Sequence, residues 1–102
     1  MSGKEVRIFI YHATDDVEGV EQAYHEVSKE LVGVPGMLGN DLMRSVHDPL
    51  GFVVMSRWVD MDAFNEWEQG PAHKGQTSAL RKYRDTRPGA VPFALYEVTA
   101  SY

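Results

Sequence analysis

The sequence contains no cysteine, which excludes disulfide bonds, thiol nucleophiles and thiolate metal sites. Long hydrophobic runs are also missing, because no apolar stretch approaches the roughly 20 residues of a membrane span, and the N-terminal residues lack the apolar core of a secretory signal. Positive charge is scarce, since 10 Lys and Arg stand against 15 Asp and Glu, for a net charge of −5 at pH 7. We therefore expect a cytoplasmic protein that binds neither nucleic acid nor membranes.

Signals for nucleotide, metal and serine-nucleophile sites are absent as well. The sequence has no glycine-rich phosphate loop and no G-x-S-x-G motif. Its four histidines are scattered without the spacing of metal ligands. His12 with Asp15 and Asp16 could form a metal corner, but a helix cap explains the two carboxylates more simply. We expect neither a metal nor a cofactor.

What is present suffices for one globular domain. The chain has 102 residues, of which 43% are hydrophobic and 25% are charged, as is typical of soluble domains. We find no linker, repeat or low-complexity stretch, and therefore expect a single domain over residues 1–102.

Hydrophobic periodicity predicts the order β-α-β-β-α-β. Apolar residues alternate from Val6 to Ile10, and then recur at helical spacing from Val17 to Leu31, after an Asp15 or Asp16 cap. The expected elements are strands at 6–11, 37–44, 52–58 and 93–99, and helices at 17–31, between Asp60 and Gly70, and at 72–84. This order indicates a ferredoxin-like α+β fold, with one antiparallel sheet and helices on one face.

The other face of that sheet needs cover. Phe52 and Val54 would point to one side and Val53 and Met55 to the other, so both faces carry apolar rows. A second copy packed sheet to sheet would bury the open row, which predicts a homodimer. The alternative is that charged side chains keep this face in water, namely Arg7, Asp41, Arg57 and Glu97.

Four segments resemble the antibiotic-biosynthesis-monooxygenase family: Pro35–Gly39, Phe52–Trp58, Asp62–Trp67 and Gly70–His73. The resemblance implies a subunit of a dimeric α/β barrel, with an aromatic-lined cleft between sheet and helices. It implies no single activity, because the family includes cofactor-independent oxygenases of aromatic polyketides, quinol oxygenases, haem-degrading enzymes and an isomerase.

The resemblance also implies site residues. Trp58, Trp67 and Phe64 would wall the cleft, with the indole N–H groups as donors and Trp67 among the catalytic residues, although aromatic residues at helical spacing also build ordinary cores. Pro71-Ala72-His73 resembles the branch with small substrates, which makes His73 the candidate acid or base. The alternative for His73 is an exposed or helix-capping side chain.

Arg57 is the candidate for stabilising a substrate anion in the cleft. Its alternative role is an ion pair across the sheet with Asp41 or Glu97.

Departures from the family pattern decide between activities. Gln76 stands where the haem-degrading branch has its ligand histidine, and the first strand carries no Asn. Val54 and Phe64 stand where polyketide oxygenases carry Asn and Tyr. We therefore expect a cofactor-independent monooxygenase that combines dioxygen with an aromatic or quinol-like small molecule, in secondary (polyketide antibiotic) metabolism. The alternatives are a non-catalytic ligand-binding barrel and, less favoured, a haem-degrading monooxygenase.

Overall fold

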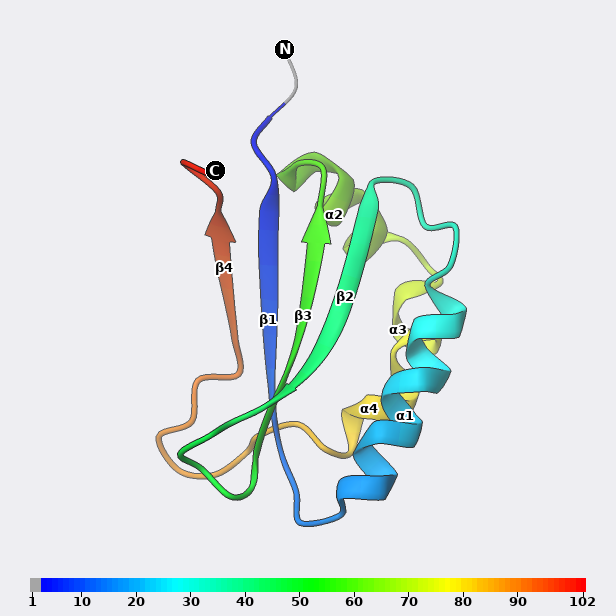
Figure 1. Ribbon diagram of the computed structural model, residues 1–102. Coiled ribbons are helices and arrows are strands. Elements are labelled where there is room, and N and C mark those ends of the chain that lie inside the picture. Colours follow the sequence, from blue (N-terminus) through cyan, green and yellow to red (C-terminus); the bar gives the residue numbers. More distant parts are fainter. Residues whose placement is uncertain (1–2) are drawn as a thin grey trace.

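The computed structural model describes residues 3–102 as one four-stranded antiparallel sheet with helices on one side (Figure 1). The strands are β1 (Val6–Ala13), β2 (Met37–Arg44), β3 (Gly51–Trp58) and β4 (Phe93–Glu97). The helices are α1 (Val17–Glu30), α2 (Met61–Gln69), α3 (His73–Gln76) and α4 (Ser78–Arg81). Within the described residues, no helix is long and apolar enough to cross a membrane.

The strand order is β2-β3-β1-β4, and this confirms the predicted ferredoxin-like α+β fold. Strand β1 pairs with β3 from Val6 opposite Trp58 to Ala13 opposite Gly51, and with β4 from Val6 opposite Glu97. Because β2 and β4 are free edges, the sheet is open and a single chain does not close a barrel.

Local sequence signals explain how α1 and α2 begin. Asp16 caps α1, since its carboxylate accepts a hydrogen bond from the Gly19 amide at 3.0 Å, and Asp60 caps α2 through the Ala63 amide at 2.9 Å. The entry to β2 turns at Gly36, whose φ is +83° and whose α-carbon faces the Ala63 side chain. A larger residue there would be strained and would also collide with α2.

The segment after α2 differs from the single helix expected at residues 72–84. The chain forms two one-turn helices that are separated at Thr77, whose hydroxyl donates to the His73 carbonyl at 3.0 Å. Residues 83–85 then run beside the end of β1, where the Ala13 amide donates to the Tyr83 carbonyl at 2.9 Å and the Asp85 amide to the Tyr11 carbonyl at 3.0 Å. Strand β4 ends at Glu97, two residues earlier than expected.

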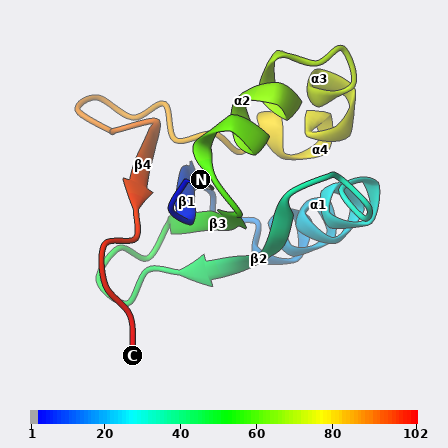
Figure 2. The same cartoon turned by 90° about the horizontal axis from the view of Figure 1, so that it is seen from above.

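The helices cover one face of the sheet unevenly. They gather beside β2 and β3 and over β1, whereas β4 stands at the opposite edge (Figures 1 and 2). Phe93 and Leu95 are half exposed on β4, although they share a face with the buried Ile8 of β1. The helical cover therefore ends before β4.

The opposite face of the sheet is open and largely apolar. Phe9 and Tyr96 pack edge to face there, with ring centroids 5.6 Å apart, and Tyr96 remains 61% exposed. Met43 and Val53 lie on the same face. Glu97 does not, because it pairs with the buried Val6 on the helix side, which corrects its assignment to the open face. The homodimer itself stays a prediction.

Candidate functional site

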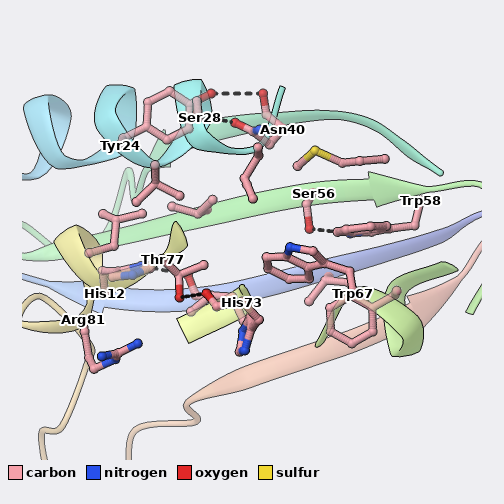
Figure 3. Close-up of a pocket in the computed structure, with 18 of the residues that line it drawn as sticks. His12, Tyr24, Ser28, Asn40, Ser56, Trp58, Trp67, His73, Thr77 and Arg81 are labelled. Carbon is pink, nitrogen blue, oxygen red and sulfur yellow. Dashed lines mark hydrogen bonds between the residues drawn. The ribbon is translucent and has the colours of Figure 1, made fainter. Parts of the chain in front are cut away.

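A cavity of about 100 Å³ lies between the helix-facing side of the sheet and helices α1 to α4 (Figure 3). Its floor is built by alternate residues of β1 and β3, because these point to the same face. Most of its lining is apolar. Three aromatic rings and His73 occupy one part of it, and His12 lies toward the other end (Figure 3).

Trp58, Phe64 and Trp67 form a contiguous aromatic wall. The ring centroid of Trp58 lies 5.5 Å from that of Phe64 and 5.2 Å from that of Trp67. Trp58 ends β3 and is 1% exposed, while the other two project from α2. The structure therefore places all three expected aromatic residues on the cavity, where Trp58 and Phe64 also belong to the hydrophobic core.

Both indole N–H groups already have partners within the protein. The Trp58 Nε1 donates to Ser56 Oγ at 2.9 Å, and the Trp67 Nε1 donates to Gln76 Oε1 at 2.7 Å. The expected role of these groups as donors to a ligand does not fit this arrangement. What the tryptophans offer the cavity is apolar ring surface.

Both polar atoms of the Gln76 amide are hydrogen-bonded, and one of them holds the Trp67 indole. Besides accepting from the indole, it donates through Nε2 to the Glu30 carbonyl at 3.1 Å, and so connects α3 to the end of α1. Gln76 is thus a structural partner of the wall. A neutral amide engaged in this way does not fit the role of a haem ligand. The cavity does not fit haem either, because its volume of about 100 Å³ is below that of an engineered cavity of about 150 Å³ that binds a single benzene ring.

His73 lines the cavity from the first turn of α3. Its ring packs edge-on against the Trp67 indole, with centroids 4.6 Å apart. Desolvation lowers the pKa of His73 below its ordinary value, and Arg81, Arg84 and Lys74 act in the same direction, against Glu68. The imidazole is therefore neutral at neutral pH, which is the form that can take a proton.

Arg57 lies away from this cavity. It alternates with Trp58 along β3 and faces the open side of the sheet, where its guanidinium approaches Gly39 of β2. No ion pair joins it to Asp41 or Glu97 among the residues that the structure describes. The expectation that Arg57 stabilises an anion in the cleft is wrong in placement, because period-two alternation puts it on the other face.

His12, considered from the sequence only as part of a metal corner with Asp15 and Asp16, is 2% exposed and lines the cavity. Its Nδ1 lies 2.9 Å from the Ile10 carbonyl oxygen. Burial lowers the pKa of His12 to about 4, and nearby Arg84 contributes in the same direction. The only available signal was its register: even-numbered residues of β1 face the helices, so His12 follows Ile8 and Ile10 inward.

Three polar side chains form a second group at the cavity, toward α1 and β2. Tyr24 donates its hydroxyl to the Asn40 carbonyl at 3.0 Å, and Ser28 donates to Asn40 Oδ1 at 3.0 Å (Figure 3). These bonds tie α1 to β2.

The buried neutral His12 predicts a loss of stability in acid. Its pKa is about 4 in the folded protein and about 6.5 in the unfolded chain, so the unfolded state binds more protons between these values. The free energy of unfolding should therefore fall as the pH drops from 6.5 to 4, by about 3 kcal/mol from this group. Urea titrations at several pH values measure this dependence.

Comparison with the His12→Gln variant isolates this contribution from other titrating groups. The variant should show a shallower decrease over the same pH window, whatever its stability at pH 7. His47→Gln serves as the control, because His47 is exposed in the turn between β2 and β3, and it should follow the unmodified protein. An equal acid dependence in His12→Gln would contradict the prediction.

Comparison with known proteins agrees with the fold. The family model described as antibiotic biosynthesis monooxygenase matches residues 5–75. No curated protein matches the sequence.

Several solved structures share the architecture. SnoaB, a cofactor-independent oxygenase from Streptomyces nogalater, superimposes with a TM-score of 0.74 at 18% identity, covering 97% of each chain. A conserved protein from Methanosarcina mazei Go1 gives a TM-score of 0.73 at 11% identity, covering 92% of each chain. A monooxygenase-like protein from Listeria innocua is 26% identical, with a TM-score of 0.64 over 90% of this chain and 54% of that one.

Proposed function

Because the chain belongs to the antibiotic biosynthesis monooxygenase family, we propose that it is a cofactor-independent monooxygenase of an aromatic or quinol-like small molecule. The observation that carries the proposal is the cavity: apolar, walled by Trp58, Phe64 and Trp67, and bordered by a neutral histidine. Such a space suits an aromatic ring and keeps water from it.

The chemistry asked of the protein is modest. A phenol that has lost its hydroxyl proton is electron-rich, and its ring reduces dioxygen directly. One oxygen atom enters an unsubstituted ring carbon ortho or para to a hydroxyl as a carbonyl, and the other leaves as water with the two hydrogens that the substrate loses. The phenol becomes a quinone and no external reductant is consumed. The protein contributes a base, a ring-shaped apolar site and exclusion of water.

His73 is the base in this proposal. Its ring touches Trp67, so a substrate stacked on the aromatic wall lies beside it. Its lowered pKa keeps it unprotonated. Trp58, Phe64 and Trp67 orient the ring of the substrate, and Arg57 has no part in the cavity.

The working unit in this proposal is a homodimer formed through the open faces of two sheets. Support comes from the apolar residues that one chain leaves on that face, among them Phe9, Met43 and Tyr96. An isologous contact would bury the same patch on both copies.

Sedimentation at micromolar concentration tests the dimer. The unmodified protein should sediment at twice the chain mass of 11.5 kDa, and Tyr96→Lys should sediment as single chains, because the new charge lies within the contact. Val46→Lys adds the same charge at a side chain that is 93% exposed in the β2–β3 turn and should remain dimeric. A single-chain mass for the unmodified protein would overturn the homodimer.

Oxygen consumption tests the enzymatic proposal. The protein is supplied with hydroquinones and other single-ring phenols, and with dihydroxynaphthalenes and anthrones as larger probes, and uptake is followed in ¹⁸O₂ with heat-denatured protein as control. We expect uptake with one ¹⁸O atom in each product molecule and no hydrogen peroxide. Uptake that is balanced by hydrogen peroxide would indicate simple autoxidation and overturn the proposal, as would no uptake across the panel.

A non-catalytic ligand-binding role is the second candidate, and one observation favours it. Polar groups around the cavity are engaged with one another: Trp67 with Gln76, Trp58 with Ser56, and Tyr24 with Asn40. Ligand-induced thermal stabilisation without any dioxygen uptake would favour this role.

A further inference from the structure

His12 is the one buried polar side chain among residues 3–102. It stands at the end of β1, with its backbone opposite Phe52 on one side and bridged to Arg84 on the other. Its ring reaches the cavity at the end remote from Trp58 (Figure 3). The roles proposed above make no use of it.

The hydrogen bond to Ile10 fixes the tautomer of this ring. A carbonyl oxygen only accepts, so the Nδ1 that lies 2.9 Å from the Ile10 carbonyl carries a hydrogen. A neutral imidazole has a single N–H, and Nε2 is therefore a lone-pair acceptor. The burial of the ring and the charge of Arg84 keep it neutral, against the weaker opposing effect of Asp85.

No donor within the described residues satisfies Nε2. The Thr77 hydroxyl donates to the His73 carbonyl, and the Tyr83 hydroxyl lies 3.4 Å from Asp16 Oδ2, facing another partner. Arg81 donates to the Lys74 carbonyl at 2.8 Å. Every completely enclosed polar side-chain atom that the structure describes has a partner, so Nε2 must border open space, which here is the cavity. Acceptor atoms inside a protein form a hydrogen bond as a rule, with a protein group, a ligand or a water molecule.

We propose that Nε2 of His12 accepts a hydrogen bond from a ring hydroxyl of the ligand and thereby selects hydroxylated single-ring compounds. The inference rests on the proposed function for the aromatic class of the ligand. The cavity volume of about 100 Å³ is below the roughly 150 Å³ that accommodates benzene in a protein core, so one ring is the largest body that the site takes with modest adjustment.

The role of His12 is recognition rather than proton removal. A phenol loses its proton near pH 10, as a tyrosine does, whereas the pKa of His12 is about 4. Transfer to Nε2 would therefore run uphill by about six orders of magnitude. A hydrogen bond in which the proton stays on the ligand requires no such transfer. On a ligand with two hydroxyl groups, His12 and His73 thus have different roles: His12 accepts a hydrogen bond from the hydroxyl that keeps its proton, and His73 takes the proton of the other.

Equilibrium binding of phenol, anisole and toluene to the full-length protein tests this proposal, with intrinsic tryptophan fluorescence as the readout. The three probes share a ring, but only phenol has a donor. We expect phenol to bind about 10- to 100-fold more tightly than anisole, and His12→Phe to bind both equally. His47→Phe, on the exposed turn, should keep the preference of the unmodified protein.

A second measurement needs no variant, in case His12→Phe does not fold. In ¹⁵N spectra of the unmodified protein, phenol should shift the Nε2 resonance of His12, while anisole should leave it in place. Equal binding of phenol and anisole, no binding of phenol at millimolar concentration, or an unmoved resonance would each overturn the proposal, and the first would show that Nε2 bonds only water. Binding is measured in the absence of dioxygen, so that no turnover occurs, and absent dioxygen uptake in the separate assay would count against the proposed enzyme and not against His12.

Discussion

Replacing Trp58 by alanine should lower the free energy of unfolding by about 3–5 kcal/mol, a large part of the roughly 5–15 kcal/mol that a domain of this size possesses. Trp58 is 1% exposed and joins Val6, Ile8 and Phe64 in one of the two hydrophobic clusters. The substitution removes the indole that packs against both Phe64 and Trp67, and it leaves Ser56 without its donor. The cavity already beside it would enlarge instead of being refilled.

Urea denaturation of the purified protein measures this loss. Trp58→Phe should recover part of the stability, because an aromatic ring still meets Phe64. Val46→Ala provides the baseline, since a side chain that is 93% exposed should change the stability by no more than about 0.5 kcal/mol. A loss below about 1 kcal/mol for Trp58→Ala would show that the wall is not part of the folded core.

Local signals in the sequence predicted the frame of the molecule because their effect is local. Asp16 and Asp60 cap their helices wherever the chain goes next, and the alternation in β1 and β3 fixes which residues share a face. The same alternation could have excluded Arg57 from the cavity, since it adjoins Trp58 and must point the other way. That error came from proximity in sequence, which along a strand means opposite faces.

Other features depend on contacts between distant segments. The helix expected at residues 72–84 breaks at Thr77, and Tyr83 then docks beside Ala13. Gln76 binds the Trp67 indole and reaches the Glu30 carbonyl, a partner 46 residues away in the chain. No periodicity reports such pairings, because each exists only once the two layers have packed. That Nε2 of His12 has no partner within the described residues can likewise be seen only in the folded structure.

Replacing His73 tests the proposed chemistry, whereas replacing Trp58 tests the packing of the core. General-base catalysis contributes about 10²- to 10⁴-fold to rate, so His73→Gln should lower kcat for dioxygen uptake by at least about 100-fold. KM should change little, because the aromatic wall that holds the ring is intact. A purely structural role would instead lower the stability and affect both constants.

The pH dependence separates the two histidines of the cavity. Since the unprotonated form of His73 is the base, kcat should rise with pH through its pKa, which burial places below the ordinary value near 6.5, and then level off. His12 cannot produce this limb, because its pKa is about 4. The limb should vanish from the residual activity of His73→Gln and persist in His47→Gln. If the pH-dependent rise in kcat persists in His73→Gln, another group is the base. Dioxygen uptake in that variant would then still support the oxygenase, but not the assignment of His73 as its base.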